Sequence, residues 1–202
     1  MTPGKRLFDI IVALIVAVIL LPVGLLMALV ILILDGRPVI YRSERMKTPT
    51  QAFMLLKFRS MKVVASDSGV SGGDKVARIT RCGAFLRRSR LDELPQLWNV
   101  LRGDISFVGP RPPLRQYVDR FPELYGEVLK SRPGITGLAT LVYHRHEEWL
   151  LARSRSVEET DAIYARACVP RKARLDLIYQ RRRNLCFDIK LMAKTVFRRI
   201  PL

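Results

Sequence analysis

The most pronounced pattern in the sequence is an apolar run from Ile10 to Leu34, which contains no charged residue. At roughly 25 residues, the run is long enough to cross a bilayer as a helix. A cleaved signal peptide fits poorly, because the run is too long and no small-residue cleavage site follows it. Pro22 lies near the middle and cannot donate to the carbonyl of Val18, so a break or kink is predicted there.

Charged residues on both flanks of the run predict where its ends lie. The basic flanking residues are Lys5 and Arg6 before the run, and Arg37, Arg42, Arg45 and Lys47 after it. Such cations hold the neighbouring chain on the cytoplasmic side, and each half of a helix broken at Pro22 is too short to cross alone. A re-entrant helix that enters, turns at Pro22 and leaves on the same face satisfies both observations. A straight span with a mild kink remains the alternative.

The rest of the chain shows shorter patterns and predicts one compact domain of mainly helical α+β structure. Short strands are expected at 38–41 and 53–58. Helices are expected over 94–101, 114–129, 157–167 and 175–197, the third ending before Pro170. No internal repeat or second domain is visible. The predicted organisation is therefore a membrane helix hairpin over 1–36 and a compact domain over 37–202.

Three further segments are expected to be irregular. The stretch 63–76 is rich in Gly, Ser and Asp and predicts a mobile surface loop. Residues 110–113 contain three prolines, which exclude regular structure, and residues 132–137 predict a turn.

Charge and composition narrow the choice of partner. The chain carries 35 Lys and Arg against 18 Asp and Glu, a net charge of +17, yet 49% of its residues are hydrophobic. Such a basic surplus calls for an acidic partner, and the apolar content favours anionic lipid and phosphorylated substrates over nucleic acid. Residues 187–199 interleave apolar and basic side chains, which suits a helix lying in the membrane interface. An ordinary core-facing helix with a solvated basic face fits the same residues equally well.

The cysteines indicate the compartment. Cys82, Cys168 and Cys186 are far apart and form no C-x-x-C pair. This argues against a disulfide framework and a zinc site, and favours the reducing cytosolic side.

Candidate chemistry begins with two adjacent acids, Asp92 and Glu93. Asp92 is a suitable N-cap, and Pro95 is tolerated only in a first helical turn, so both acids are expected at a helix N-terminus. The helix end should favour the ionised form of Asp92. Adjacent helical residues point about 100° apart, so the two acids cannot do the same job. An N-cap followed by a first-turn acid is the structural alternative.

Basic residues supply the second group of candidates. Arg111 is held between prolines after Gly109, so it can act as a fixed clamp for phosphate, or lie exposed on a rigid loop. Lys57 and Arg59 alternate with apolar residues and are weaker candidates for substrate binding, the alternative being the basic face of a half-buried strand. The pair His144 and His146 has no third metal ligand at a suitable spacing, which favours surface histidines.

Four segments in this order resemble the bacterial sugar transferase family, the monotopic phosphoglycosyl transferases, and in particular its small, stand-alone catalytic type. They are Lys57-Phe58-Arg59-Ser60-Met61, Leu91-Asp92-Glu93-Leu94-Pro95-Gln96, Gly109-Pro110-Arg111-Pro112 and Arg132-Pro133-Gly134-Ile135-Thr136-Gly137. They follow a hydrophobic segment broken by proline, and the resemblance covers nearly the whole chain. One departure is Leu21, where the family often has a serine before the proline.

The resemblance implies roles for individual residues. Asp92 matches the nucleophile, and Glu93 its partner, expected to ligate Mg²⁺. Arg87 and Arg111 match cations that contact phosphate. The Pro22 break matches a re-entrant membrane helix, which would leave the whole chain on the cytoplasmic face of the inner membrane.

The implied activity is transfer of a sugar-1-phosphate from a nucleotide-sugar, with uridine as the expected base, to polyprenol phosphate. UMP would be released through an aspartyl-phosphosugar intermediate in the first membrane step of glycan assembly, and downstream glycosyltransferases are candidate partners. Sugar specificity is expected to depend on residues 63–76 or 138–153, although neither segment carries a readable code. The competing classes are a basic membrane-anchored binding module and a structural scaffold, neither of which needs an Asp-Glu pair.

Overall fold

The computed structural model describes residues 1–64, 70 and 72–197. Part of the predicted loop at 63–76, and Arg198 and Arg199 of the predicted interfacial segment, lie outside the described residues. The described chain is mainly helical with two small two-stranded sheets, which confirms the expected α+β class. The division of the chain after residue 36 stays a prediction.

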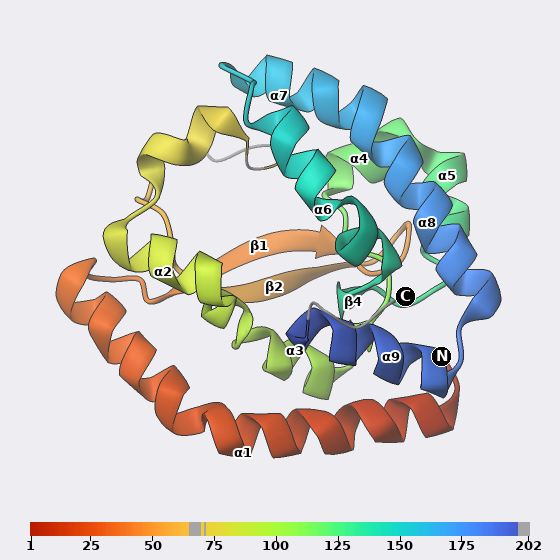
Figure 1. Cartoon of the computed structure of the whole chain (residues 1–202), viewed down its shortest axis with the longest axis horizontal. Helices are drawn as coiled ribbons and strands as arrows, with labels where there is room; N and C mark the ends of the chain where they lie inside the picture. Colours follow the sequence, from red (N-terminus) through yellow and green to blue (C-terminus); the bar gives the residue numbers. More distant parts are fainter. Residues whose placement is uncertain (65–69, 71, 198–202) are drawn as a thin grey trace.

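Helix α1 (Pro3–Leu34) is a single helix of 32 residues that continues through Pro22. It lies along one side of the molecule and bends partway along its length (Figure 1). Within it, only Asp9, Ala13 and Ile31 are buried, while most of its large apolar side chains are exposed. The helix is long and apolar enough to cross a membrane, and this exposed apolar surface indicates a membrane location for the protein.

Both ends of α1 are bonded to the body of the protein. At its start, Arg6 donates to the carbonyls of Val100 and Leu101 at 2.5 and 2.6 Å. Beyond its end, Arg59 donates to three successive carbonyls, those of Asp35, Gly36 and Arg37. The helix is therefore fixed to one folded body at both termini.

The two sheets place the segments that carry the sequence motifs. Strand β1 (Ile40–Met46) pairs antiparallel with β2 (Ala52–Phe58), and β3 (Ser106–Val108) pairs in parallel with β4 (Gly134–Thr136). The predicted turn at 132–137 is therefore wrong for its central residues. Two glycines permit this close pairing, since a Cβ on Gly134 would lie 2.3 Å from the backbone nitrogen of Gly109.

The first helices of the domain surround the strands. They are α2 (Arg81–Ser89), the 3₁₀ turns η1 (Gly73–Arg78) and η2 (Leu91–Glu93), α3 (Gln96–Arg102), α4 (Arg115–Arg120) and α5 (Pro122–Val128). The helix predicted over 114–129 is split at Phe121, because the residue before a proline is disfavoured in helical conformation and Pro122 begins α5. The predicted helix at 94–101 corresponds to α3.

The later helices complete the domain. They are α6 (Leu138–Leu151), α7 (Val157–Ile163), the π-helical turn η3 (Tyr164–Cys168), α8 (Val169–Arg182) and α9 (Leu185–Val196). The expected end before Pro170 is wrong, because this proline lies in the first turn of α8, where its missing N–H is tolerated. The expected single helix at 175–197 is interrupted where Arg183 is extended and Asn184 caps α9.

The core places α1 against the rest of the molecule. Ala13 of α1 packs in a cluster with Phe53, Val100 and Leu191, and Ile31 packs in another with Phe58. In Figure 1, α3 and α9 lie between α1 and the small sheets, while α6, α7 and α8 lie on the far side. The two termini of the described chain thus lie near the side that α1 covers.

Candidate active site

The acid pair lies in the 3₁₀ turn η2, between α2 and α3. Arg90 has a left-handed backbone (φ 58°), which ends α2 and reverses the chain into this turn. The N-cap prediction for Asp92 is wrong, because α3 begins at Gln96 and its cap residue, Pro95, makes no side-chain cap bond. Asp92 is instead 7% exposed, so most of its surface is removed from water.

Lys57 and Arg111 reach the same acids from other elements. Lys57 Nζ, on β2, lies 3.2 Å from Glu93 Oε1 and 3.9 Å from Asp92 Oδ2. Arg111 Nη1, three residues after β3, lies 3.8 Å from Glu93 Oε1. Three motifs that are distant in the sequence therefore meet at Glu93. Arg87, on the last turn of α2, lines the same cavity.

The two acids differ in electrostatic environment. Burial would raise the pKa of Glu93, but the charges of Lys57, Arg111 and Arg90 outweigh it and hold the pKa below its ordinary value. Burial raises the pKa of Asp92 above its ordinary value, although the nearby Lys57 charge acts in the opposite direction. Asp92 thus lies in the first turn of the helical segment η2, as expected, but its burial opposes the ionised form that a helix end was expected to favour. Glu93 is the stabilised anion of the pair.

Arg59 belongs to the same sequence motif as Lys57, but its side chain makes different contacts. Its guanidinium is bonded to the carbonyls that end α1, and its side chain is buried. These bonds join β2, which carries Lys57, to the end of the membrane helix.

A cavity of about 1280 Å³ opens beside the acids. Its α6 wall contains Thr140, His144, Glu147 and Glu148, which lie on one helical face in a segment for which no helix was predicted. His144 lies 3.3 Å from Glu148 and is partly buried, whereas His146 is exposed and stacks on Trp149. Residues 138–151 are thus positioned to contact whatever enters the cavity.

The cavity lining also includes charged residues that sequence reasoning missed. Lys172 and Asp176 lie on α8, and Arg45 lies on β1. Lys172 Nζ lies 2.9 Å from Glu147 Oε1, whereas Asp176 Oδ1 is buried without a hydrogen-bond partner. Burial raises the pKa of Asp176 to about 7. Arg45 was expected only as one of the cations that flank the apolar run, and no spacing in the sequence marks Lys172 or Asp176.

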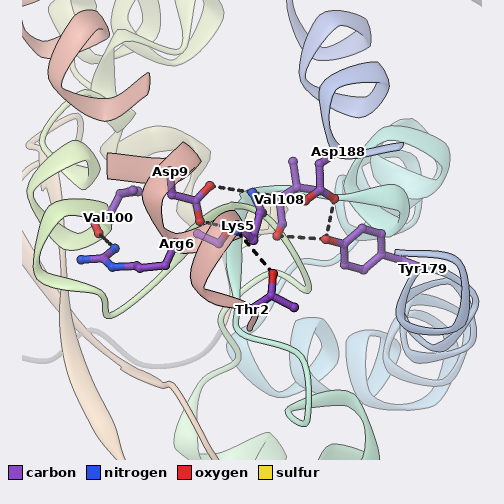
Figure 2. A network of polar contacts seen from close by, with 9 residues as sticks. Thr2, Lys5, Arg6, Asp9, Val100, Val108, Tyr179 and Asp188 are labelled. Carbon is purple, nitrogen blue, oxygen red and sulfur yellow. Dashed lines mark hydrogen bonds and ion pairs between the residues drawn. The ribbon is translucent and has the colours of Figure 1, made fainter. Parts of the chain in front are cut away.

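A buried ionic network links the start of α1 to α9. Lys5 Nζ lies 2.5 Å from Asp9 Oδ1, one turn along α1, and 3.2 Å from Asp188 Oδ2 on α9 (Figure 2). Both carboxylates are nearly inaccessible to solvent. Lys5 therefore compensates two buried negative charges at once.

The same network fixes both ends of β3. Ser106 Oγ, at its start, donates to Asp9 Oδ2 at 2.7 Å. At its end, the Tyr179 hydroxyl lies 2.7 Å from Asp188 Oδ1 and 3.3 Å from the carbonyl of Val108 (Figure 2). Arg111 follows Val108 by three residues. Contacts at the start of α1 therefore help to position the strand that precedes this arginine.

The donor set at the acid pair can be tested for metal binding. Within the described ranges, no group of three or more His, Cys, Asp or Glu side chains is placed to hold a metal. Asp92 and Glu93 do lie together in the cavity, and Mg²⁺ commonly uses one or two carboxylates and completes its shell with water and substrate phosphates. The residues thus fit a magnesium ion that is bound jointly with a phosphorylated substrate.

The fold and site together define a membrane-associated protein with a cationic, carboxylate-bearing cavity suited to phosphorylated substrates. The family model for bacterial sugar transferases matches residues 2–200, and the chain belongs to this family.

Several curated proteins are similar to the chain. A UDP-glucose:undecaprenyl-phosphate glucose-1-phosphate transferase from Escherichia coli K12 is 36% identical over 198 residues, which are 96% of this chain and 39% of that protein. A putative undecaprenyl-phosphate N-acetylgalactosaminyl 1-phosphate transferase from Bacillus subtilis is 45% identical over 118 residues, 58% of this chain and 66% of that protein. A UDP-N-acetylgalactosamine-undecaprenyl-phosphate N-acetylgalactosaminephosphotransferase from Aeromonas hydrophila is 37% identical over 145 residues, 69% of this chain and 34% of that protein. The chain thus spans about two fifths of the first relative's length.

Proposed function

We propose that the protein transfers a sugar-1-phosphate from a UDP-sugar to polyprenol phosphate and releases UMP. Membership of the bacterial sugar transferase family and the substrates named for its relatives support this substrate pair. The observation that carries the proposal is the asymmetry of the acid pair. Glu93 is engaged by Lys57 and Arg111, while Asp92 lies beside the cavity with Lys57 no closer than 3.9 Å.

In the first step, a carboxylate oxygen of Asp92 attacks the phosphorus that bears the sugar. A bond forms between this oxygen and phosphorus, the bond from phosphorus to the bridging oxygen breaks, and UMP leaves with the electron pair. In the second step, an oxygen of the lipid phosphate attacks the same phosphorus and frees the Asp92 carboxylate. Covalent capture lets one cavity serve a soluble donor and a membrane acceptor in turn.

The cations prepare the cavity for this chemistry. Arg87 and Arg111 would bind phosphate oxygens and offset the charge that repels an anionic nucleophile. Lys57 would hold Glu93 ionised, and Glu93 would hold Mg²⁺. When bound, Mg²⁺ would withdraw negative charge from the diphosphate.

The membrane arrangement follows from the attachment of α1. A helix of 32 residues is about 48 Å long, enough to reach both faces of a bilayer. Yet its start is bonded through Arg6, and the chain beyond its end through Arg59, to one compact body. We infer that α1 is re-entrant, with its Pro22 region deepest and both ends on the cytoplasmic face of the inner membrane.

Other exposed apolar residues would support the same surface. Trp98 on α3, and Leu185, Ile189 and Val196 on α9, are exposed, and basic residues of α9 lie among them. This composition suits helices that rest in the headgroup region. Such docking would bring the acid pair close to a membrane-bound phosphate acceptor.

Trapping tests the covalent step. The protein is incubated with a UDP-sugar and Mg²⁺ while the lipid is withheld, and intact mass is measured quickly because an acyl phosphate is labile. The mass should rise by one phosphosugar, and the adduct should vanish when polyprenol phosphate is added. Asp92→Asn should give no adduct, while Glu93→Gln should be partly rescued by excess Mg²⁺. An adduct on Asp92→Asn would overturn the nucleophile assignment.

A further inference from the structure

Arg45 is a half-buried cation that lines the cavity and has no acidic partner among the described residues. It lies on β1 and lines the same cavity as Asp92 and Arg111. Its Nε atom is buried and has no hydrogen-bond partner. Among the described residues, no carboxylate forms an ion pair with it, whereas Lys57 has Glu93 and Lys172 has Glu147 at 3.2 and 2.9 Å. Acids of the cavity thus pair with Lys57 and Lys172 but not with Arg45.

Arg45 and Arg111 are also held close to one another. The backbone N–H of Met46 donates to the carbonyl of Pro113 at 3.0 Å, which ties the end of β1 to the segment that carries Arg111. Burial and the positive charge of Arg111 together lower the pKa of Arg45 to about 10. Two guanidinium charges that repel each other across a partly desolvated cavity are unfavourable unless an anion binds near both.

We propose that Arg45 binds a phosphate oxygen of the substrate together with Arg111. Phosphate is the anion favoured here, because a guanidinium donates several hydrogen bonds in a fixed fork and Asp92 of the same cavity must reach a phosphorus atom. This assignment rests on the proposed function for the identity of the substrate. The phosphate belongs either to the diphosphate of the donor or to the lipid acceptor.

The surrounding structure explains why a folding role does not account for Arg45. A side chain kept for stability would pair its charge or bury only its stem. Here a buried donor lacks an acceptor and a second cation lies near it, and both features oppose folding of the unliganded protein. The bound anion would remove both penalties at once.

The test uses Arg45→Met in the full-length, detergent-solubilised protein. Its control is Arg115→Met, because Arg115 is an exposed arginine that pairs with Glu44 at 2.9 Å. UDP and UMP binding are measured by calorimetry, and thermal unfolding is measured without ligand. Arg45→Met should weaken UDP binding about tenfold or more, as expected for loss of a charged hydrogen bond. Its unfolding temperature without ligand should stay equal or rise, and the control should bind UDP normally.

The outcomes separate the two phosphate sources. Weaker UDP binding assigns Arg45 to the donor, while normal UDP binding with a raised KM for polyprenol phosphate assigns it to the acceptor. Unchanged values for both substrates would overturn the proposal, as would a lowered unfolding temperature with unchanged affinities. If Arg45→Met fails to fold, Arg45→Lys provides the same readouts, with partial retention of affinity expected.

The proposed function can fail independently. If the wild-type protein releases no UMP from any UDP-sugar yet binds UDP through Arg45, the transferase assignment is wrong and the phosphate site stands. If UMP is released and Arg45→Met changes the affinity for neither substrate, the transferase assignment stands and the role of Arg45 is wrong.

Discussion

Lys57 Nζ lies 3.2 Å from Glu93 Oε1, so a strand residue supplies the counter-charge for a carboxylate 36 positions further along the chain. Burial lowers the pKa of Lys57, and Glu93 acts against this effect. The pair makes the charge of each residue depend on the other. Lys57 therefore bears on the site through Glu93 as well as through any direct contact with substrate.

Replacing Lys57 should change the pH dependence of turnover. In Lys57→Met, both Glu93 and Asp92 lose a nearby positive charge, so their pKa values should rise and the acid limb of activity should move to higher pH. The deficit relative to wild type should be on the order of tenfold near neutral pH and shrink as pH increases. UMP release measured across pH checks this. Lys130→Met is the matched control, and a deficit that is equal at every pH would indicate a substrate contact instead.

In the proposed mechanism, the wild-type protein should have an acid limb of activity at raised pH. Asp92 would have to be ionised to attack phosphorus, and burial raises its pKa above its ordinary value. Activity should therefore fall as pH decreases through this raised pKa, above the value of about 3.9 for a free aspartate. The profile of kcat/KM reports the free enzyme. A profile that stays flat down to pH 4 would contradict the raised pKa.

Arg111→Lys should keep the charge but lose the paired donors of the guanidinium. A well-placed catalytic donor is worth about 2.7–4 kcal/mol, so turnover should fall on the order of a hundredfold. Steady-state UMP release is the measurement, with Arg115→Lys as the exposed control. Near-normal turnover in a folded Arg111→Lys protein would make Arg111 an exposed arginine on a rigid loop.

Asp176→Asn should stabilise the protein at neutral and alkaline pH. The carboxyl is 6% exposed, and burial raises its pKa from 3.8 to about 7. The folded protein therefore carries no penalty below pH 3.8, a growing one between the two values, and the full one above pH 7. At about 1.4 kcal/mol per pKa unit, the full penalty is about 4 kcal/mol at most. Chemical unfolding at pH 8 and pH 4 should show a gain at pH 8 alone, and an equal change at both would refute the ionisation.

Both ends of α1 should label from the same side of the membrane. Thr2→Cys and Gln51→Cys introduce exposed probes before and after the helix, and the exposed Cys186 is first replaced by serine. An impermeant thiol reagent applied to inverted inner-membrane vesicles should reach both positions. Opposite sidedness of the two labels would favour a straight span. Pro22→Leu should shift some molecules toward that outcome.

Short sequence patterns correctly predicted those helices and strands that depend on neighbouring residues alone. The apolar run predicted a long membrane helix, Gly103 ends α3 with φ 87°, and the strand prediction at 53–58 corresponds to β2. Motif order was enough to select Asp92, Glu93 and Arg111, which the structure brings together. These signals depend on a few adjacent residues and survive without tertiary information.

The failures share a different cause, which is dependence on distant contacts. Strand β4 exists because Gly109 allows Gly134 to approach, and nothing near residue 134 reveals this. Pro170 reads as a helix stop, yet the helical path continues because the proline falls in a first turn. Arg45 and Asp176 could be recognised as site residues only from the fold. It shows that Arg45 Nε lacks an acceptor and that Asp176 Oδ1 lacks a donor.

The ionic network of Lys5, Asp9 and Asp188 at the start of α1 affects any attempt to make a soluble fragment. Deleting α1 would remove Lys5, the cation that lies 3.2 Å from Asp188, and would leave that carboxylate buried opposite Tyr179. It would also remove Asp9, the hydrogen-bond acceptor of Ser106, so the start of β3 would lose this contact. The apolar helix α1 is therefore a structural part of the folded body, and a truncated protein would need a substitution such as Asp188→Asn before it could be compared with the intact chain.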